Sequence, residues 1–222
     1  VNLCKKYKIL VIEDAAAALG SQYKKRHLGT FGLAGCISFN GNKIITTGSG
    51  GMIVTDNKKF AKKAKHLIQT AKKFHEYEFI HDEIGYNLRM PNLNASLGLG
   101  QVKNLNKFLS LKRKLYSKYK KNLDDINELT LFSERKFSKS NYWLQTIILN
   151  DKYKKLKNIL IEELNRKGAR VRPAWKLISS LKPYTKFPKM NLSGAKNIYS
   201  KVINLPSGPG IMLKLKKNRR FN

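Results

Sequence analysis

An acidic residue, a serine and a lysine follow short apolar runs in the first quarter of this 222-residue chain. Asp14 comes directly after the run KILVIE, and Lys43 lies in a polar loop after the run GCISFN. Ser38 stands five residues before Lys43. A glycine cluster follows the lysine, at Gly48, Gly50 and Gly51. Because ligands of open α/β sheets bind beyond the carboxyl ends of the strands, we expect these groups to face one crevice.

An acid and a lysine at such a crevice can hold opposite ends of a flat aromatic cofactor. Pyridoxal 5′-phosphate needs a lysine that condenses with its aldehyde and an acidic partner for its ring N–H⁺. Asp14 would keep the ring nitrogen protonated, and Lys43 would need a dry seat in which its amine is partly uncharged. The residues alone leave two simpler interpretations open: Asp14 as a turn or helix cap, and Lys43 as a surface lysine. The GSGG segment matches neither of the common phosphate-loop patterns.

The elements that must position these residues are short strands followed by helices. Apolar runs predict three strands, and the apolar spacing after Asp56, which we expect to act as the cap, predicts a helix. The expected ranges are strands over 8–13, 35–40 and 51–55, a helix over 56–71, and one long helix over 92–123. This order of elements favours an α/β fold with a mainly parallel sheet.

The second half of the chain has the pattern of a compact α+β unit. The expected elements are a strand over 142–149, a helix over 151–167, a strand over 169–173, helices near 175–181 and 193–201, and a frayed tail over 213–222. The chain loosens over 124–140. We therefore expect residues 1–124 to form part of a large cofactor-binding domain that includes a long interdomain helix, and residues 125–222 to form a small C-terminal domain.

The charge of the chain is strongly one-sided, with 45 basic residues against 14 acidic ones and a formal net charge of +31. Such a field attracts polyanions, so a basic nucleic-acid-binding protein is an alternative. The lysines are scattered along predicted helices and are not gathered in one basic arm, and arginine supplies only nine of the 45. A nucleic-acid partner is therefore the weakest of the interpretations.

The two cysteines, Cys4 and Cys36, are far apart and have no metal-ligand spacing, so we expect a reduced, cytoplasmic protein. No apolar run approaches the ~18 residues that a membrane span requires, and we expect no membrane partner and no metal.

Four longer segments closely resemble the DegT/StrS-type sugar aminotransferases: VIEDAAAALGS, GTFG, SFNGNKIITTGSGGMIVT and HDEIGYNLRMPNLNASLG. The resemblance runs from about Ile9 to at least Pro206. It implies the aspartate-aminotransferase-like fold, which is fold type I of the pyridoxal phosphate enzymes. It also implies transamination of a nucleotide-linked 4-keto sugar, with glutamate as the amino donor, for surface-glycan biosynthesis. The segments FNGNKIITTG and FIHDEIGYNLRMPNLNA look most like the branch of this family that acts on UDP-linked 4-keto-6-deoxy-N-acetylhexosamines, on routes to bacillosamine or legionaminic acid.

The resemblance assigns roles to single residues. Lys43 matches the Schiff-base lysine, Asp14 the acid facing the pyridine nitrogen, and Ser38 a serine that helps to hold the cofactor phosphate. Asn87 matches an asparagine that reaches across a dimer interface to the neighbour's cofactor phosphate, so the resemblance implies a homodimer. The same block contains residues that line the site or brace that interface, namely His81, Tyr86 and Arg89. The segment RPAW, 172–175, looks like the family's small-domain segment near the substrate.

Two departures bear on activity. Ala17 stands where the family usually has Gln or Glu to support the cofactor's ring oxygen, and a methyl group makes no hydrogen bond. The family's first half, with its phosphate-gripping loop and ring-stacking aromatic residue, has no counterpart before Val1. We therefore expect an N-terminally truncated chain, and an inactive truncated remnant of such an enzyme is the leading alternative function.

Overall fold

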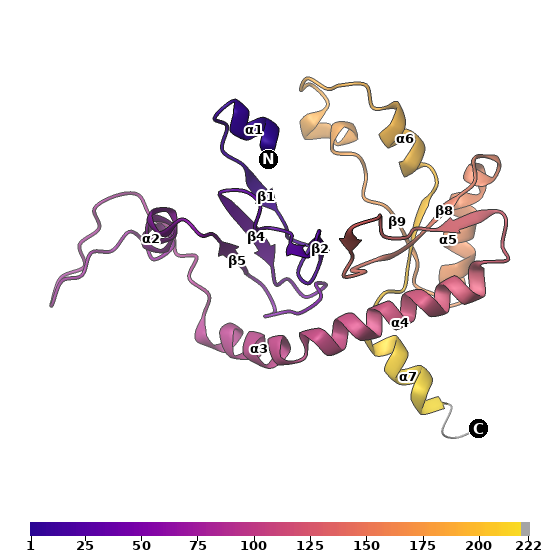
Figure 1. Cartoon of the computed structure of the whole chain (residues 1–222), viewed down its shortest axis with the longest axis horizontal. Coiled ribbons are helices and arrows are strands. Elements are labelled where there is room, and N and C mark those ends of the chain that lie inside the picture. The colour runs from indigo at the N-terminus through magenta and orange to yellow at the C-terminus, as the bar shows by residue number, and fades with distance from the viewer. Residues whose placement is uncertain (219–222) are drawn as a thin grey trace. The chain divides into compact units, whose positions relative to one another are not determined.

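The computed structural model describes residues 1–218, with side chains up to Leu215. The chain forms two compact units (Figure 1). Unit 1 comprises residues 1–109 and 135–141, and unit 2 comprises residues 110–134 and 142–222. The first boundary between the units, at residue 109, lies inside a helix, and the segment 135–141 belongs again to unit 1. The predicted domain boundary lies at residue 124. The two-domain division at that residue stays a prediction.

The main sheet of unit 1 has three strands in the order β1-β4-β5 (Figure 1). The strands are β1 (Ile12–Asp14), β4 (Ala34–Ser38) and β5 (Gly51–Val54). β1 and β4 are parallel, whereas β4 and β5 are antiparallel, and this last pairing differs from the predicted mainly parallel sheet. The connection 39–50 contains no helix, and a parallel pairing would need a long crossover.

The start of the chain also differs from the expected strand over 8–13. A short helix, α1 (Asn2–Lys6), comes first, and β1 begins only at Ile12. Lys8 between them has a φ of 54°, in the left-handed region, which ends the helix and separates it from the strand.

A second, smaller sheet of unit 1 was not predicted. It has the order β3-β2-β7, with β2 (Gln22–Tyr23), β3 (Arg26–His27) and β7 (Ser138–Lys139). Lys24 and Lys25 join β2 to β3 with φ values of 48° and 66°, as a two-residue type I′ turn requires. β7 pairs with β2 from more than a hundred residues away, so no local pattern marks it.

The next helix of unit 1 after α1 is α2 (Lys58–Leu67). Its cap is Asn57, whose side chain accepts a 2.9 Å hydrogen bond from the Phe60 N–H, so the predicted cap at Asp56 is wrong by one residue. The predicted single helix over 92–123 is two helices, α3 (Asn92–Lys103) and α4 (Leu105–Leu123). Asn104 separates them: its side chain donates to the Gly100 carbonyl at 3.0 Å and so competes with the helical backbone pattern.

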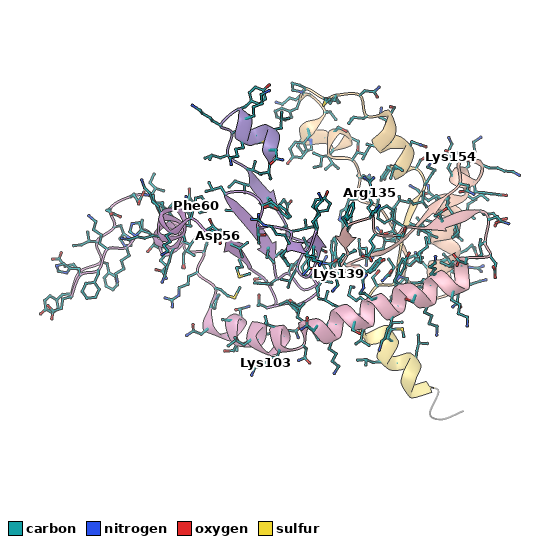
Figure 2. All side chains as sticks on the ribbon, in the orientation of Figure 1. Asp56, Phe60, Lys103, Arg135, Lys139 and Lys154 are labelled. Carbon is teal, nitrogen blue, oxygen red and sulfur yellow. The ribbon has the colours of Figure 1, made fainter. Side chains whose placement is uncertain are left out.

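Between α2 and α3 the chain leaves the helix, extends and returns (Figure 1); we call residues 72–88 the arm. Its side chains stand out along both limbs of the ribbon in Figure 2. Several are large, apolar and exposed: Phe74, Tyr77, Phe79, Ile84 and Leu88.

Unit 2 contains an antiparallel sheet in the order β6-β8-β10-β9. The strands are β6 (Leu129–Leu131), β8 (Gln145–Leu149), β10 (Val202–Leu205) and β9 (Arg172–Pro173). Buried and half-buried residues alternate along β8, as expected for a strand with one face on the core. The core cluster comprises Ile147, Leu149, Val171 and Ile203. The apolar side of α5 (Lys157–Arg166) packs against it.

The remaining elements of unit 2 follow the predicted order with different bounds, except that η3 and α7 were not predicted. They are the 3₁₀ helices η1 (Asp151–Leu156), η2 (Ile178–Ser180) and η3 (Lys182–Tyr184) and the helices α6 (Ser193–Tyr199) and α7 (Gly210–Asn218). The predicted strands over 142–149 and 169–173 are shorter in the structure, and β10 was not predicted. The predicted frayed tail is wrong up to Asn218, where α7 ends, and its last four residues lie outside the described part. Over residues 1–218, no helix is long and apolar enough to cross a membrane.

Candidate active site

The carboxyl ends of β1 and β4 bring two of the predicted site residues to one edge of the sheet. β1 and β4 are parallel neighbours, and Asp14, the last residue of β1, is in register with Cys36. Ser38 is the last residue of β4, two positions further along the same strand. Asp14 and Ser38 therefore lie at the edge where an α/β sheet binds its ligands.

Lys43 lies in the loop that leaves this edge, residues 39–50, which we call the lysine loop. Backbone hydrogen bonds close its base: the Phe39 N–H donates to the Gly50 carbonyl at 2.9 Å, and the Thr47 N–H donates to the Phe39 carbonyl at 3.0 Å. Ile44 and Ile45, directly after the lysine, are buried, and Ile45 is only 2% exposed. Lys43 itself is half-buried, so the expected dry seat is only partly present in this chain.

Helix α3 packs against the far limb of the lysine loop. The Asn94 side chain donates a 2.6 Å hydrogen bond to the Thr47 carbonyl. Gly98, one helical turn later, comes so close that a Cβ at this position would lie 2.8 Å from Thr47 Cγ2. The loop that carries Lys43 is therefore fixed both by its own backbone and by a helix.

Asp14 and Ser38 each make one local hydrogen bond. Asp14 Oδ1 accepts from the Ala16 N–H at 3.1 Å, and Ser38 Oγ accepts from the Asn40 N–H at 3.3 Å. The simpler interpretation, in which the Asp14 side chain caps a turn, therefore accounts for this hydrogen bond. An ionised carboxylate has further acceptor positions, and the Asp14 side chain is exposed, so the turn leaves it able to face a cationic ring nitrogen.

Glu13 is a residue that sequence reasoning missed. Its carboxylate accepts hydrogen bonds from three backbone N–H groups, those of Gly29, Phe31 and Gly32. Burial by itself would raise the pKa of Glu13, but these three N–H donors and the nearby Arg26 hold it below the ordinary value. Glu13 therefore fixes the GTFG segment beside β1, and the only sequence signal for it was its place next to Asp14.

Asn141 fixes the turn that follows Asp14, and sequence reasoning missed it as well. Its side-chain amide donates to the carbonyls of Ala17 and Leu19 at 2.8 and 2.9 Å, and its backbone N–H donates to Ser21 Oγ at 3.0 Å. Asn141 is buried, and it lies more than a hundred residues from its partners. The turn that contains Ala17 is thus held through its backbone, while the Ala17 side chain offers no hydrogen bond.

Asn87, the fourth predicted site residue, lies on the arm and not at the sheet edge. It is exposed and forms an isolated antiparallel bridge with Gln69. The structure therefore brings Asp14, Ser38 and the lysine loop together along β1 and β4, and leaves Asn87 apart from these strand ends.

The base of the arm is attached to α2 by a cluster of charged side chains. His66 Nε2 lies 2.7 Å from Asp82 Oδ1 and 3.4 Å from Glu83 Oε1. The hydrogen bond from His66 lowers the pKa of Asp82 against the opposing effect of desolvation, and the charge of Lys73 adds to the lowering. Lys63 pairs with Glu83, so lysines already compensate both carboxylates. His81 Nδ1 lies 2.7 Å from the Thr70 carbonyl, a contact that braces the arm.

Comparison with known proteins connects this geometry to one family. The DegT/DnrJ/EryC1/StrS aminotransferase family matches residues 1–217. A GDP-perosamine synthase of Escherichia coli O157:H7 is 36% identical over 214 residues, which is 95% of this chain and 56% of that protein. A UDP-4-amino-4,6-dideoxy-N-acetyl-beta-L-altrosamine transaminase of Campylobacter jejuni is 31% identical over 96% of this chain and 57% of its own length.

A solved structure confirms the predicted fold class. Helicobacter pylori PseC, an aminotransferase involved in the biosynthesis of pseudoaminic acid, superimposes with a TM-score of 0.91 at 27% identity. The match covers 98% of this chain and 59% of the PseC chain. The chain thus has the architecture of fold type I, and it spans less than two thirds of the length of the relatives it matches.

Proposed function

Because this chain belongs to the DegT/DnrJ/EryC1/StrS aminotransferase family, we propose that it is the lysine-bearing part of a sugar-nucleotide aminotransferase. Glutamate would donate the amino group, and a nucleotide-linked 4-keto sugar would accept it. The observation that carries the proposal is the placement of Lys43 on a closed loop at the same sheet edge as Asp14. The names of the relatives, a GDP-perosamine synthase and a UDP-sugar transaminase, support the substrate class.

Aminotransferases of this family are pyridoxal phosphate enzymes, and the groups at the sheet edge fit that cofactor. When bound, the cofactor supplies an electron sink for charge that develops on the substrate carbon. The Asp14 carboxylate would hold the proton on the ring nitrogen, and the Ser38 hydroxyl would donate to the phosphate. Lys43 Nζ would bind the cofactor's aldehyde carbon and would carry a proton to and from the substrate carbon.

The arm supports a homodimer as the working unit. Its large apolar side chains are exposed within the chain, Phe74 to 99%, and a second copy would remove them from water. In such a dimer Asn87 would bind the cofactor phosphate of the neighbouring subunit. An active site shared in this way needs both copies.

An inactive remnant is the second candidate function, and one observation favours it. Ala17 leaves one cofactor contact unmade. We expect the 222 residues alone to bind pyridoxal phosphate weakly and to show no turnover. A further alternative is a basic nucleic-acid-binding protein, and the basic residues of the described part of the chain are spread over many elements.

Trapping the cofactor on the lysine tests the proposal, because the chain offers 36 lysines for the same reaction. The full chain is incubated with limiting pyridoxal phosphate and reduced with borohydride, and the modified peptides are mapped by mass spectrometry. We expect labelling at Lys43 ahead of the exposed lysines, with loss of this label in Lys43→Ala and a smaller yield in Asp14→Asn. Lys58→Ala, an exposed lysine at the start of α2, is the matched control. Labelling spread over the lysines in proportion to their exposure would overturn the proposal.

A further inference from the structure

The last part of the chain carries positive charge without acidic residues beside it in the sequence. All 14 acidic residues come before Leu164, whereas 15 of the 45 basic residues follow it. One segment of unit 2, residues 176–190, contains four of these basic residues, and we call it the basic segment: Lys176, Lys182, Lys186 and Lys189. Within the described part of the chain, no Asp or Glu side chain forms a salt bridge with any of the four. The basic segment therefore presents uncompensated positive charge.

Large apolar side chains are exposed along the same segment. Every residue from 182 to 190 is exposed, and Met190 is exposed to 89%. Isolated apolar residues are common on protein surfaces, but here they recur between the lysines. The exposed apolar residues are Ile178, Tyr184, Phe187 and Met190. Exposed apolar side chains that are grouped in this way, with polar groups around them, indicate an interaction surface.

Local turns bring the apolar and basic groups together. The helices η2 and η3 lie in the basic segment. The Tyr184 N–H donates to the Leu181 carbonyl at 2.8 Å, and the Phe187 N–H donates to the Tyr184 carbonyl at 3.3 Å. The ring centroids of Tyr184 and Phe187 are 6.3 Å apart, and Lys186 Nζ lies 5.9 Å from the centroid of the Phe187 ring. Two aromatic rings and an ammonium group thus occupy one part of the surface.

We propose that the basic segment binds the surface of an anionic lipid bilayer. The lysine ammonium groups pair with the lipid phosphates, and the exposed apolar side chains enter the boundary between headgroups and acyl chains. Aromatic side chains favour this depth, and the flexible lysine stems keep the charges at the headgroups. The prediction of no membrane partner rested on the lack of a spanning run, and a surface contact does not need one.

Single-stranded nucleic acid is the other polyanion for which lysines and aromatic residues form a site. Its bases stack on flat rings, and the aliphatic side chains of Ile178 and Met190 offer no ring face. The ring planes of Tyr184 and Phe187 are inclined by 41° to each other, so these two rings do not form one flat platform. The exposed aliphatic side chains beside the lysines therefore favour a lipid surface.

Sedimentation of the full chain with sucrose-loaded vesicles tests the proposal. Vesicles of phosphatidylcholine alone are compared with vesicles in which phosphatidylcholine is mixed with anionic phosphatidylglycerol. We expect binding to the anionic vesicles, with slower hydrogen exchange over residues 178–190 in the bound chain. Because the whole chain carries a net charge of +31, binding alone does not locate the contact, and the exchange measurement and the variants do.

The first pair of variants tests the charge. Lys182→Gln combined with Lys186→Gln weakens binding to the anionic vesicles about thirtyfold, since each lysine near such a surface contributes about fivefold. The control is Lys120→Gln combined with Lys121→Gln, at two exposed positions of α4 in the same unit. The control removes the same net charge from outside the basic segment, so we expect a much smaller loss.

The second pair of variants tests the apolar contact. At about 0.5 M salt the attraction of the lysines is screened, and the binding that remains reports on burial of apolar side chains. Ile178→Ser combined with Met190→Ser weakens this remaining binding about tenfold. Leu156→Ser combined with Ile159→Ser, which changes two exposed apolar residues elsewhere in unit 2, leaves it unchanged.

Three results would overturn the proposal. An equal loss of binding in both lysine pairs would assign the vesicle contact to the charge of the whole chain. Unchanged hydrogen exchange over residues 178–190 in the bound chain would place the contact elsewhere. Protection of these residues by single-stranded DNA or by inorganic phosphate, and not by vesicles, would assign the basic segment to a soluble anion. Lysine trapping at Lys43 involves none of these residues, so either proposal can fail alone.

Discussion

Adjacent residues of β1 have different tasks because a strand turns successive side chains to opposite faces. Glu13 faces the GTFG segment and accepts three backbone N–H groups, while Asp14 ends the strand at the proposed cofactor edge. The two carboxylates stand next to each other in the sequence, yet only one is available to a ligand. Glu13 thereby fixes the strand whose end presents Asp14.

Replacing Glu13 tests whether its carboxylate fixes the GTFG segment beside β1. Glu13→Gln keeps the shape but removes the charge that makes these hydrogen bonds strong, so we expect a loss of about 1–3 kcal/mol in local stability. The folded-state pKa of Glu13 is lowered, so its stabilisation is present above the ordinary pKa of 4.5 and disappears as the pH falls through the folded value. Hydrogen exchange of the Gly29 and Gly32 amides at neutral and acid pH measures both effects. Equal exchange in the variant and the original chain at neutral pH would contradict the argument.

Lys112, a buried cation, provides a second prediction about stability and pH. Burial lowers the pKa of Lys112 to about 8, below the ordinary 10.5. Between these values the unfolded state binds more protons, so unit 2 gains stability as the pH rises from about 8 towards 10.5. Lys112→Met removes this gain and leaves the Trp143 and Ser207 carbonyls without their donor. Urea unfolding over this pH range compares the slopes, with Lys114→Met, an exposed neighbour on α4, as the control. Identical slopes for the original chain and Lys112→Met would contradict the prediction.

The candidate site residues that the sequence predicts stand where apolar runs end, and their role toward a cofactor stays a prediction. Asp14, Ser38 and Lys43 are of this kind, because a strand's end can be read from the composition around it. Glu13 and Asn141 were not predictable in the same way. Their partners are backbone groups, in the case of Asn141 more than a hundred residues distant, and no residue type marks a backbone partner.

At the scale of elements, the lysine loop depends on α3 as well as on the sheet. Asn94 makes the polar contact to Thr47, and Gly98 allows the helix to approach. The same helix begins directly after the segment that returns from the arm. The arm and the lysine loop are thus both adjacent to α3, the first along the chain and the second by packing.

Removing the Asn94 contact should loosen the loop without changing its chemistry. Asn94→Ala leaves the Thr47 carbonyl without this donor, and we expect faster hydrogen exchange over residues 43–48 and a lower yield of cofactor trapped on Lys43. Asn92→Ala, an exposed position on the same helix, is the matched control. A variant in which the exchange of the loop is unchanged would show that the backbone bonds of the loop suffice.

The elements themselves were predictable where local patterning is strong. The strands β4 and β5 and the helices α2 and α5 follow from apolar runs and helical spacing. The antiparallel pairing of β5, the break at Asn104 and the small sheet of β2, β3 and β7 do not, because pairing across distant segments and single side-chain hydrogen bonds decide them. These features are tertiary effects that override local propensity.

At the scale of the whole chain, two surface properties act against each other. Large apolar side chains are exposed on the arm and near the start of the chain, for example Phe79, Ile84 and Leu10. The net charge of +31 opposes any association between copies. The basic residues are distributed over many elements: Lys103, Lys139 and Lys154, labelled in Figure 2, lie on α3, β7 and η1. Repulsion of this kind is screened by salt, whereas burial of apolar surface is not.

Salt should therefore change self-association and nucleic-acid binding in opposite directions. Raising the ionic strength from about 0.05 to about 0.5 M screens the repulsion, so we expect the mean mass from light scattering to increase. Retention on DNA should decrease over the same range and be lost by about 0.5 M, because it rests on released counterions. If the arm forms the interface, replacing Phe74 and Phe79 by serine reduces the salt-driven association. The matched control replaces Ile9 and Leu10, two exposed apolar residues outside the arm, by serine. Retention on DNA that survives this salt concentration would favour the basic nucleic-acid-binding alternative. A mass that stays constant in all chains would contradict the role given to the arm.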